Sequence, residues 1–268
     1  MRRIVLLALL LCLTLFAAVC VLVRQREAPS FIDAKRACSF LESQYVPEVG
    51  LLRASVEAYP ENITIYVTSD NLLAVKALEL CSSPLSREVK KVLASSYPRL
   101  AHGDGLHEVL LGRTIGAFRS QRELLFGVFN GYLVKAHVFD GAVMADWYEY
   151  ADLVAYRGLN ATWSSRLKEA ELAWSNLTRM WDGYGFKDKA FDGRYESYKL
   201  ALAYLLAKNL KVEDPIAKSL EEVMSKLQAD NGGIYTHYVA VDGKIVPAGD
   251  VNVETTSIFI IACLSTKH

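Results

Sequence analysis

Two kinds of helical segment alternate along the chain beyond Pro29. Segments of the first kind place apolar residues three or four positions apart, which is the spacing of an amphipathic helix. We expect such helices over residues 31–45, 86–97, 162–180 and 215–229. Segments of the second kind are apolar on nearly every side and cover residues 71–78, 195–210 and 251–264. Because a helix that is hydrophobic all round must be buried, we expect the amphipathic helices to cover the apolar ones from outside.

The pattern changes between residues 112 and 137, where β-branched and aromatic residues become more frequent. Asn130-Gly131 lies between two such runs, and this dipeptide is a strong signal for a tight turn between two strands. We therefore expect a small β-hairpin insert, followed by a helix over residues 145–157. Together the patterns predict a mainly α fold of alternating inner and outer helical hairpins, in the form of an α/α toroid or an open arc.

A resemblance to a known family lies in the starts of the apolar helices. A loop with aromatic and glycine residues precedes Glu254-Thr255-Thr256, which opens the last apolar helix, and Ser69-Asp70-Asn71 and Tyr195-Glu196-Ser197-Tyr198 hold the equivalent places. This order resembles the inner-helix starts of six-hairpin glycosidase-type toroids over residues 31–264. The chain has about four hairpins, whereas that family has six or seven. The resemblance therefore implies an incomplete ring, an open arc or half of a dimeric ring.

The N-terminal residues form a separate apolar segment. Residues 4–23 carry no charge and follow Arg2 and Arg3. Twenty helical residues span about 30 Å, the thickness of a hydrocarbon core. We expect residues 1–28 to be a cytoplasmic tip and a transmembrane signal anchor, and residues 29–268 to be an extracytoplasmic domain of a single-pass membrane protein. A cleaved signal peptide and a secreted protein are the alternative.

Two further features become relevant if residues 29–268 are exported. Asn62, Asn160 and Asn176 each open an N-x-[ST] sequon, so we expect a glycoprotein. Beyond the leader the cysteines are Cys38, Cys81 and Cys263. Cys38 and Cys81 lie at similar depths of neighbouring predicted helices and could form a disulfide, while three buried, inert thiols are the other interpretation.

Composition and charge exclude several classes of protein. The chain has 268 residues, with 30 Lys and Arg against 30 Asp and Glu. This balance argues against nucleic-acid binding, which relies on neutralising phosphates. His102, Asp104, His107 and Glu108 lie close together, but their spacing matches no metal motif and reads equally well as a turn. The sequence contains none of the common nucleotide or cofactor motifs, so we expect neither metal nor cofactor.

Candidate catalytic residues follow from the resemblance. In proteins that this chain resembles, catalytic carboxylates and sugar-stacking aromatic residues lie on the loops before the inner helices. The carboxylates at matching positions are Asp70, Asp146, Glu196 and Glu254, with Asp182, Asp188 and Asp250 on the loops. We expect Glu254 and Asp70 to be catalytic, since glycoside hydrolysis needs a carboxylic acid and a carboxylate across the bond. The expected substrate-binding residues are Trp181, Tyr184, Tyr195, Tyr235, Asp146 and Asp250.

Two functions remain open from the sequence. The first is a membrane-anchored, glycoside hydrolase-like protein that acts on or binds a polysaccharide or glycan. The second is a non-catalytic component of the cell envelope that binds a glycan or a protein, in which the same carboxylates merely cap helices. The oligomeric state is open in both.

Overall fold

The computed structural model describes residues 31–56, 64–97, 105–129 and 132–265. The chain divides into two units, residues 1–30 and 31–268, and all the described residues belong to the second unit. Of the described residues, 48% are helical and 22% lie in strands, which form three small sheets. The protein is therefore of mixed α/β class, and the prediction of a mainly α toroid is wrong. The patterns in the sequence predicted fewer strands than the structure contains.

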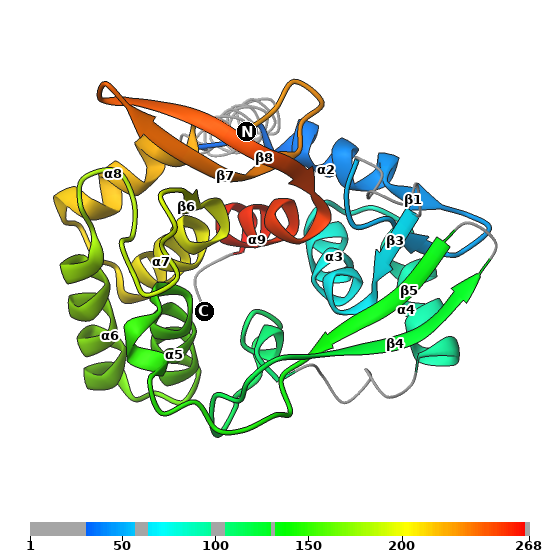
Figure 1. Ribbon diagram of the computed structural model, residues 1–268, viewed down its shortest axis with the longest axis horizontal. Helices are drawn as coiled ribbons and strands as arrows, with labels where there is room; N and C mark the ends of the chain where they lie inside the picture. The colour runs from blue at the N-terminus through cyan, green and yellow to red at the C-terminus, as the bar shows by residue number, and fades with distance from the viewer. Residues whose placement is uncertain (1–30, 57–63, 98–104, 130–131, 266–268) are drawn as a thin grey trace, which may run out of the picture. The chain divides into compact units, whose positions relative to one another are not determined.

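Four helices of the structure are apolar on nearly every side, and they pack against one another in a series. They are α3 (Thr68–Leu80), α5 (Ala151–Trp163), α7 (Ser197–Leu210) and α9 (Val253–Leu264). Helix α9 lies between α3 and α7, and α7 in turn packs on α5 (Figure 1). This series of contacts forms the centre of the hydrophobic core, because helices of this kind have no face that suits water.

Four amphipathic helices lie outside the apolar ones, each with one apolar face turned toward them. They are α2 (Ala34–Ser43), α4 (Leu85–Ser96), α6 (Leu167–Met180) and α8 (Pro215–Met224). Helix α4 packs on α3, α2 on α9, α8 on α7 and α6 on α5 (Figure 1). Each amphipathic helix thus covers an apolar one next to it.

The first large sheet contains the predicted hairpin. Strands β4 (Arg122–Phe129) and β5 (Tyr132–Val138) pair antiparallel with a bulge between Leu125 and Gly127, so the hairpin prediction is confirmed. Strand β3 (Thr64–Val67) pairs parallel to β5, which gives the order β3-β5-β4. A two-stranded pair, β1 (Tyr45–Val46) and β2 (Leu51–Leu52), connects α2 to this region.

The second large sheet was not predicted. Strand β7 (Ile234–Val241) pairs antiparallel with β6 (Tyr195–Glu196) on one side and with β8 (Lys244–Asn252) on the other. Asp242 and Gly243 connect β7 to β8 and have φ angles of 50° and 73°, as the tightest hairpin turn requires. Pro247 within β8 argues against a strand, but β8 is an edge strand and an edge tolerates a missing N–H.

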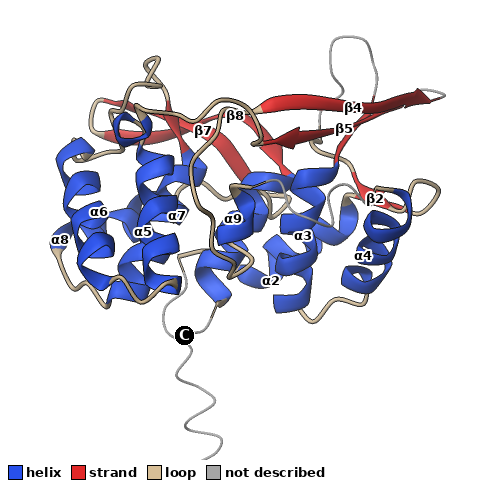
Figure 2. Ribbon diagram, turned by 90° about the horizontal axis from the view of Figure 1, so that it is seen from below, coloured by secondary structure: helices blue, strands red, loops and turns tan. Residues whose placement is uncertain are grey.

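Three strands lead into apolar helices with no residue between them. Strand β3 ends at Val67 and α3 begins at Thr68; β6 leads into α7, and β8 into α9, in the same way. A short 3-10 turn, η3 (Trp147–Glu149), precedes α5. Figure 2 shows the larger strands on one side of the helices. The first turns of the apolar helices therefore begin at the sheets.

The predicted membrane location is corrected here. Within the described ranges, no helix combines the length and the apolar character needed to cross a membrane. The expected signal anchor, residues 1–28, lies outside the described residues.

One of the three sequons is incompatible with a glycan in the folded protein. Asn160 lies in α5 with 1% of its surface exposed. Its carboxamide accepts a hydrogen bond from the N–H of Ile115 and donates one to the carbonyl of the same residue, at 2.9 and 3.0 Å. Asn62 lies outside the described residues, and Asn176 lies half-buried in α6.

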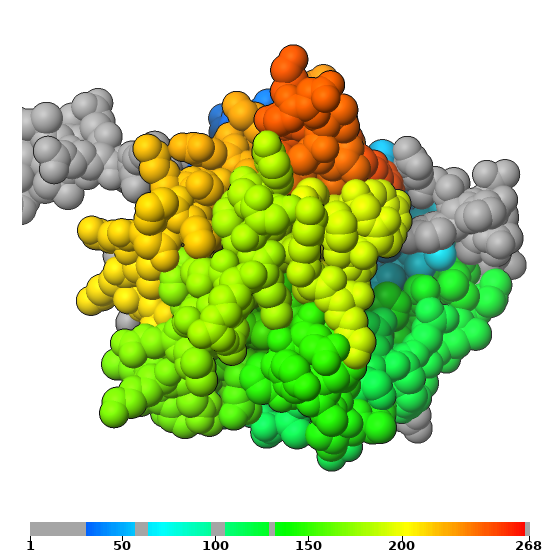
Figure 3. Space-filling view, turned by 60° about the vertical axis from the view of Figure 1, so that its left-hand side comes forward, coloured from blue at the N-terminus to red at the C-terminus, as the bar shows by residue number. Residues whose placement is uncertain are grey.

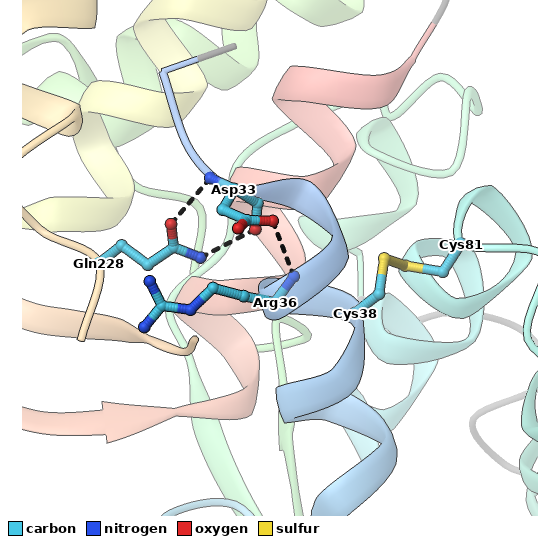
Figure 4. Close-up of a disulfide and its surroundings, with 5 residues drawn as sticks. All are labelled: Asp33, Arg36, Cys38, Cys81 and Gln228. Carbon is cyan, nitrogen blue, oxygen red and sulfur yellow. Dashed lines mark hydrogen bonds between the residues drawn. A yellow bond between two sulfur atoms is a disulfide. The ribbon is translucent and has the colours of Figure 1, made fainter. Parts of the chain in front are cut away.

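A disulfide joins α2 to the end of α3. Cys38 and Cys81 are bonded, with their Cα atoms 5.9 Å apart, which resolves the two interpretations of these cysteines (Figure 4). At its N-terminus, α2 is capped by the Asp33 carboxylate, which accepts a hydrogen bond from the N–H of Arg36 at 3.0 Å. The Gln228 carboxamide bonds both the N–H and the carbonyl of Asp33 (Figure 4). The outer helix α2 is thus fastened at its N-terminus and near its middle.

The disulfide generates a stability prediction. Its cysteines are 43 residues apart, and a cross-link of that span lowers the entropy of the unfolded chain. Replacing both Cys38 and Cys81 by Ala lowers the free energy of unfolding by about 2–4 kcal/mol, measured by urea denaturation. Cys263→Ser is the control, because Cys263 forms no disulfide with any described cysteine. Equal stability of the double variant and the control would contradict the prediction.

Candidate functional site

A cleft opens beside the first turns of α5, α7 and α9. Its volume is about 270 Å³. Two carboxyl groups, Asp152 and Glu254, face it together with aromatic rings and one imidazole. The lining residues are Leu106, His107, Ser120, Gln121, Phe139, Met144, Tyr150, Asp152, Leu153, Tyr156, Tyr198 and Glu254.

The register of the helices accounts for the groups that meet in the cleft. Asp152, Tyr198 and Glu254 are each the second residue of an apolar helix, in α5, α7 and α9 respectively. The second residue of each helix belongs to its first turn, and in α5, α7 and α9 this residue lines the cleft. The second residue of α3 is Ser69, whose hydroxyl accepts a hydrogen bond from the N–H of His137 at 3.2 Å. Apolar helices thus present one polar side chain each from the same turn.

Glu254 is held as a carboxylate. Its side chain is 33% exposed, and its Oε1 lies 3.4 Å from Nε2 of His107. Burial opposes its ionisation, but the hydrogen bond and charge of His107, with the charge of His137, outweigh this and lower the pKa of Glu254. The first turn of α9 adds a positive helix end that favours an anion there. Asn252 fixes this turn, because its side chain accepts from the N–H of Thr255 at 2.8 Å.

The pKa of Asp152 is shifted in the opposite direction. Burial raises its pKa, the positive charge of Lys199 lowers it in part, and the negative charge of Glu196 raises it further. The Tyr198 hydroxyl donates a hydrogen bond to Oδ2 of Asp152 at 3.1 Å. Burial and the neighbouring Asp152 also raise the pKa of Tyr198, so this phenol remains protonated and can keep donating. One cleft therefore holds two carboxyl groups whose pKa values are shifted in opposite directions, that of Asp152 upward and that of Glu254 downward.

A buried ion pair holds the start of α5, the helix that carries Asp152. Oδ2 of Asp188 accepts a hydrogen bond from the N–H of Ala151 at 2.8 Å and lies 2.7 Å from Nζ of Lys199. The side chain of Asp188 is fully buried and that of Lys199 is 5% exposed. Lys199 also pairs with Glu196. Because Ala151 directly precedes Asp152, this pair fixes the start of α5 against α7.

The two expected catalytic residues are placed differently. Glu254 lines the cleft. Asp70 is the third residue of α3, is 5% exposed, and has the Ser69 hydroxyl 3.4 Å from its Oδ1. It does not line the cleft, and Asp152 is the carboxyl group that shares the cleft with Glu254. The pairing of Asp70 with Glu254 stays a prediction.

The expected substrate-binding residues lie at three other places. Tyr195 is buried, stacks on Tyr238 and donates a hydrogen bond to Asp182 at 2.6 Å; Trp181 packs on Phe186 nearby. Their loop, which also carries Tyr184, lies between the β7–β8 hairpin (orange) and α5 (green) in Figure 3.

The remaining two places are separate from that loop. Tyr235 and Asp250 line a shallow hollow of about 350 Å³, and Asp146 forms an ion pair with Lys189 at 2.6 Å. None of the six expected residues lines the cleft of Glu254.

Three residues of the cleft were missed or read otherwise. Asp152 and Tyr198 were not singled out, although aligning the starts of the apolar helices by their second residue would have found both. His107 was considered only as a metal ligand or as part of a turn, and it contacts Glu254 instead. No group of three or more His, Cys, Asp or Glu side chains in the described part could hold a metal ion. His102 and Asp104 lie outside the described residues.

Comparison with known proteins adds no relative. The chain matches no protein-family model, no curated protein and no solved structure.

The buried ion pair generates a second stability prediction. Lys199→Met leaves the buried Asp188 carboxylate without its cation, and we expect a loss of about 3–5 kcal/mol in the free energy of unfolding. Lys187→Met is the matched control, because Lys187 pairs with Asp182 while 54% exposed, and a loss below about 1 kcal/mol is expected. Urea denaturation measures both, and equal losses would show that the Lys199 pair does not fix α5 and α7.

Proposed function

We propose that this protein hydrolyses glycosidic bonds, with Asp152 as the general acid and Glu254 as the catalytic carboxylate. The observation that carries this proposal is the opposite direction of the two pKa shifts within one cleft. Model-compound values place Asp at about 3.9 and Glu at about 4.3, so the cleft separates two similar groups into an acid and a base. Pairs of carboxyl groups separated in this way carry out acid–base chemistry.

The roles follow from the surroundings of each group. Asp152 protonates the oxygen of the departing sugar, because its proton is retained at a pH where an ordinary carboxyl has lost it. Glu254 either activates a water molecule or attacks the anomeric carbon directly, and its separation from Asp152 in the complex with substrate decides between the two. His107 orients the Glu254 carboxylate and stabilises its charge. Tyr198 orients Asp152.

The walls of the cleft suit a sugar ring. Tyr150, Tyr156 and Phe139 supply apolar faces, while Ser120 and Gln121 supply hydrogen-bonding groups. Sites that bind small molecules combine apolar and aromatic walls with a few polar groups in this manner. The volume of about 270 Å³ fits a short part of a chain rather than a long one.

Kinetics of variants test the proposal. The full-length protein is assayed on a panel of 4-nitrophenyl glycosides and on polysaccharides by reducing-end release. Glu254→Gln is expected to lower kcat by about 10²–10⁴-fold on every substrate. Asp152→Asn is expected to lower it similarly on unactivated sugars but far less on 4-nitrophenyl glycosides, whose leaving group needs no proton.

The pH dependence of the activity tests the direction of both pKa shifts. Activity falls at low pH as Glu254 gains a proton, and this limb lies below the usual range of Glu because its pKa is lowered. Activity falls at high pH as Asp152 loses its proton, and this limb lies above the usual range of Asp because its pKa is raised. Asp152→Asn is expected to remove the high-pH limb.

Two controls sharpen this test. Asp146→Asn changes an exposed carboxylate outside the cleft and is expected to leave the kinetics unchanged. Asp70→Asn distinguishes the pair predicted from the sequence, since a loss as large as that of Glu254→Gln would assign the acid to Asp70. Glycan binding without any product from the unaltered protein would contradict hydrolysis and favour the non-catalytic alternative.

A further inference from the structure

A second, larger hollow adjoins the cleft. Its volume is about 630 Å³, and it shares Leu106, Phe139 and Leu153 with the cleft. Its other wall is the segment 113–119, which connects η2 (His107–Val109) to β4. Because the two spaces share these three lining residues, they lie side by side.

The charges of the hollow differ from those of the cleft. Arg113 and Arg119 line it, with Glu108 as its one acidic lining residue. Arg113 lies 2.7 Å from Glu108, whereas Arg119 donates to the carbonyl of Gly141 at 3.1 Å. Within the described ranges, Arg119 forms no ion pair with a carboxylate within 4.0 Å. Each guanidinium carries five N–H donors in a planar fork, so both keep donors for a further partner.

The segment that carries the arginines is fixed on both sides. The Asn160 carboxamide bonds the N–H and the carbonyl of Ile115, at the middle of the segment. Phe118 is buried and packs on Trp147 with ring centroids 5.6 Å apart, and Arg119 bridges to Val143. A site held in place before binding loses less entropy when a ligand arrives.

We propose that this hollow binds the carboxylate of an acidic sugar unit through Arg119 and Arg113, so that the substrate is an anionic glycan containing uronic acid. A planar carboxylate matches the guanidinium fork and can accept two parallel hydrogen bonds. The proposal rests on the proposed function, because it takes the neighbouring cleft as the place where the glycan is cut.

Binding measured by calorimetry on the full-length protein tests the inference. The probes are an oligogalacturonate and a neutral cello-oligosaccharide of equal length. We expect the acidic oligomer to bind at least about tenfold more tightly than the neutral one, with an affinity that falls as salt rises. Arg119→Gln is expected to remove this preference. The matched control is Arg122→Gln. Arg122 is an exposed arginine of β4 that pairs with Asp140 and does not line the hollow.

The outcomes separate this inference from the proposed hydrolysis. Equal binding of both oligomers, no binding of either, or equal effects of the two arginine variants would overturn the acidic-sugar site. Competition by inorganic sulfate at matched ionic strength, as strong as that by galacturonate, would also overturn it, since the hollow would then take any small anion. Binding of the acidic oligomer that Arg119 controls, with no cleavage and no effect of Glu254→Gln, would keep the site and refute the hydrolysis.

Discussion

The direct junctions between strands and apolar helices constrain the rest of the structure. Strands β3, β6 and β8 end at the residue before α3, α7 and α9 begin, so no linker lets a helix rotate or slide. The sheet register then determines where each first turn lies. Since the apolar helices also pack on one another, a shift of one of them would disturb the contacts of its neighbours. This constraint places the first turns of α3, α7 and α9, and direct contacts such as Tyr198–Asp152 and His107–Glu254 then orient the polar side chains.

The electrostatics of the cleft depend on that positioning. Burial raises the pKa of any carboxyl group, and both Asp152 and Glu254 experience it. They differ in their neighbours. Glu254 contacts His107. The cation whose charge lowers the pKa of Asp152 is Lys199, and this side chain is itself paired with Asp188 and Glu196. The same cost of burial therefore ends in a raised pKa at Asp152 and a lowered pKa at Glu254.

The sequence predicted the helices better than the strands. Helical periodicity is strong over ten or more residues, and it separated the apolar α7 and α9 from the amphipathic α6 and α8. The β4–β5 hairpin was found through Asn130-Gly131. The β7–β8 hairpin was missed, although Asp242-Gly243 is an equivalent turn. Pro247 and Gly249 weaken the strand pattern, and their tolerance at a sheet edge is a property of the tertiary structure.

The site could be predicted only in part, for a related reason. Glu254 was found because it opens a visibly apolar helix. Asp70 was chosen on the same grounds, yet it lies one position further into its helix than Glu254 does, and a step of one residue turns a side chain by about 100°. Asp152 follows the 3-10 turn η3 rather than a strand, and this hid its equivalence to Glu254. His107 opens the 3-10 turn η2, whose approach to α9 no local pattern encodes.

The proposed chemistry requires Asp152 and Glu254 to titrate in the reverse of their ordinary order. Carboxyl carbon NMR of the full-length protein, with Asp152→Asn and Glu254→Gln to assign the two signals, measures both groups directly. We expect Asp152 to titrate at a higher pH than Glu254, although free Asp titrates lower than free Glu. Titration of Asp152 at or below the pH of Glu254 would contradict the assignment of acid and base in this cleft.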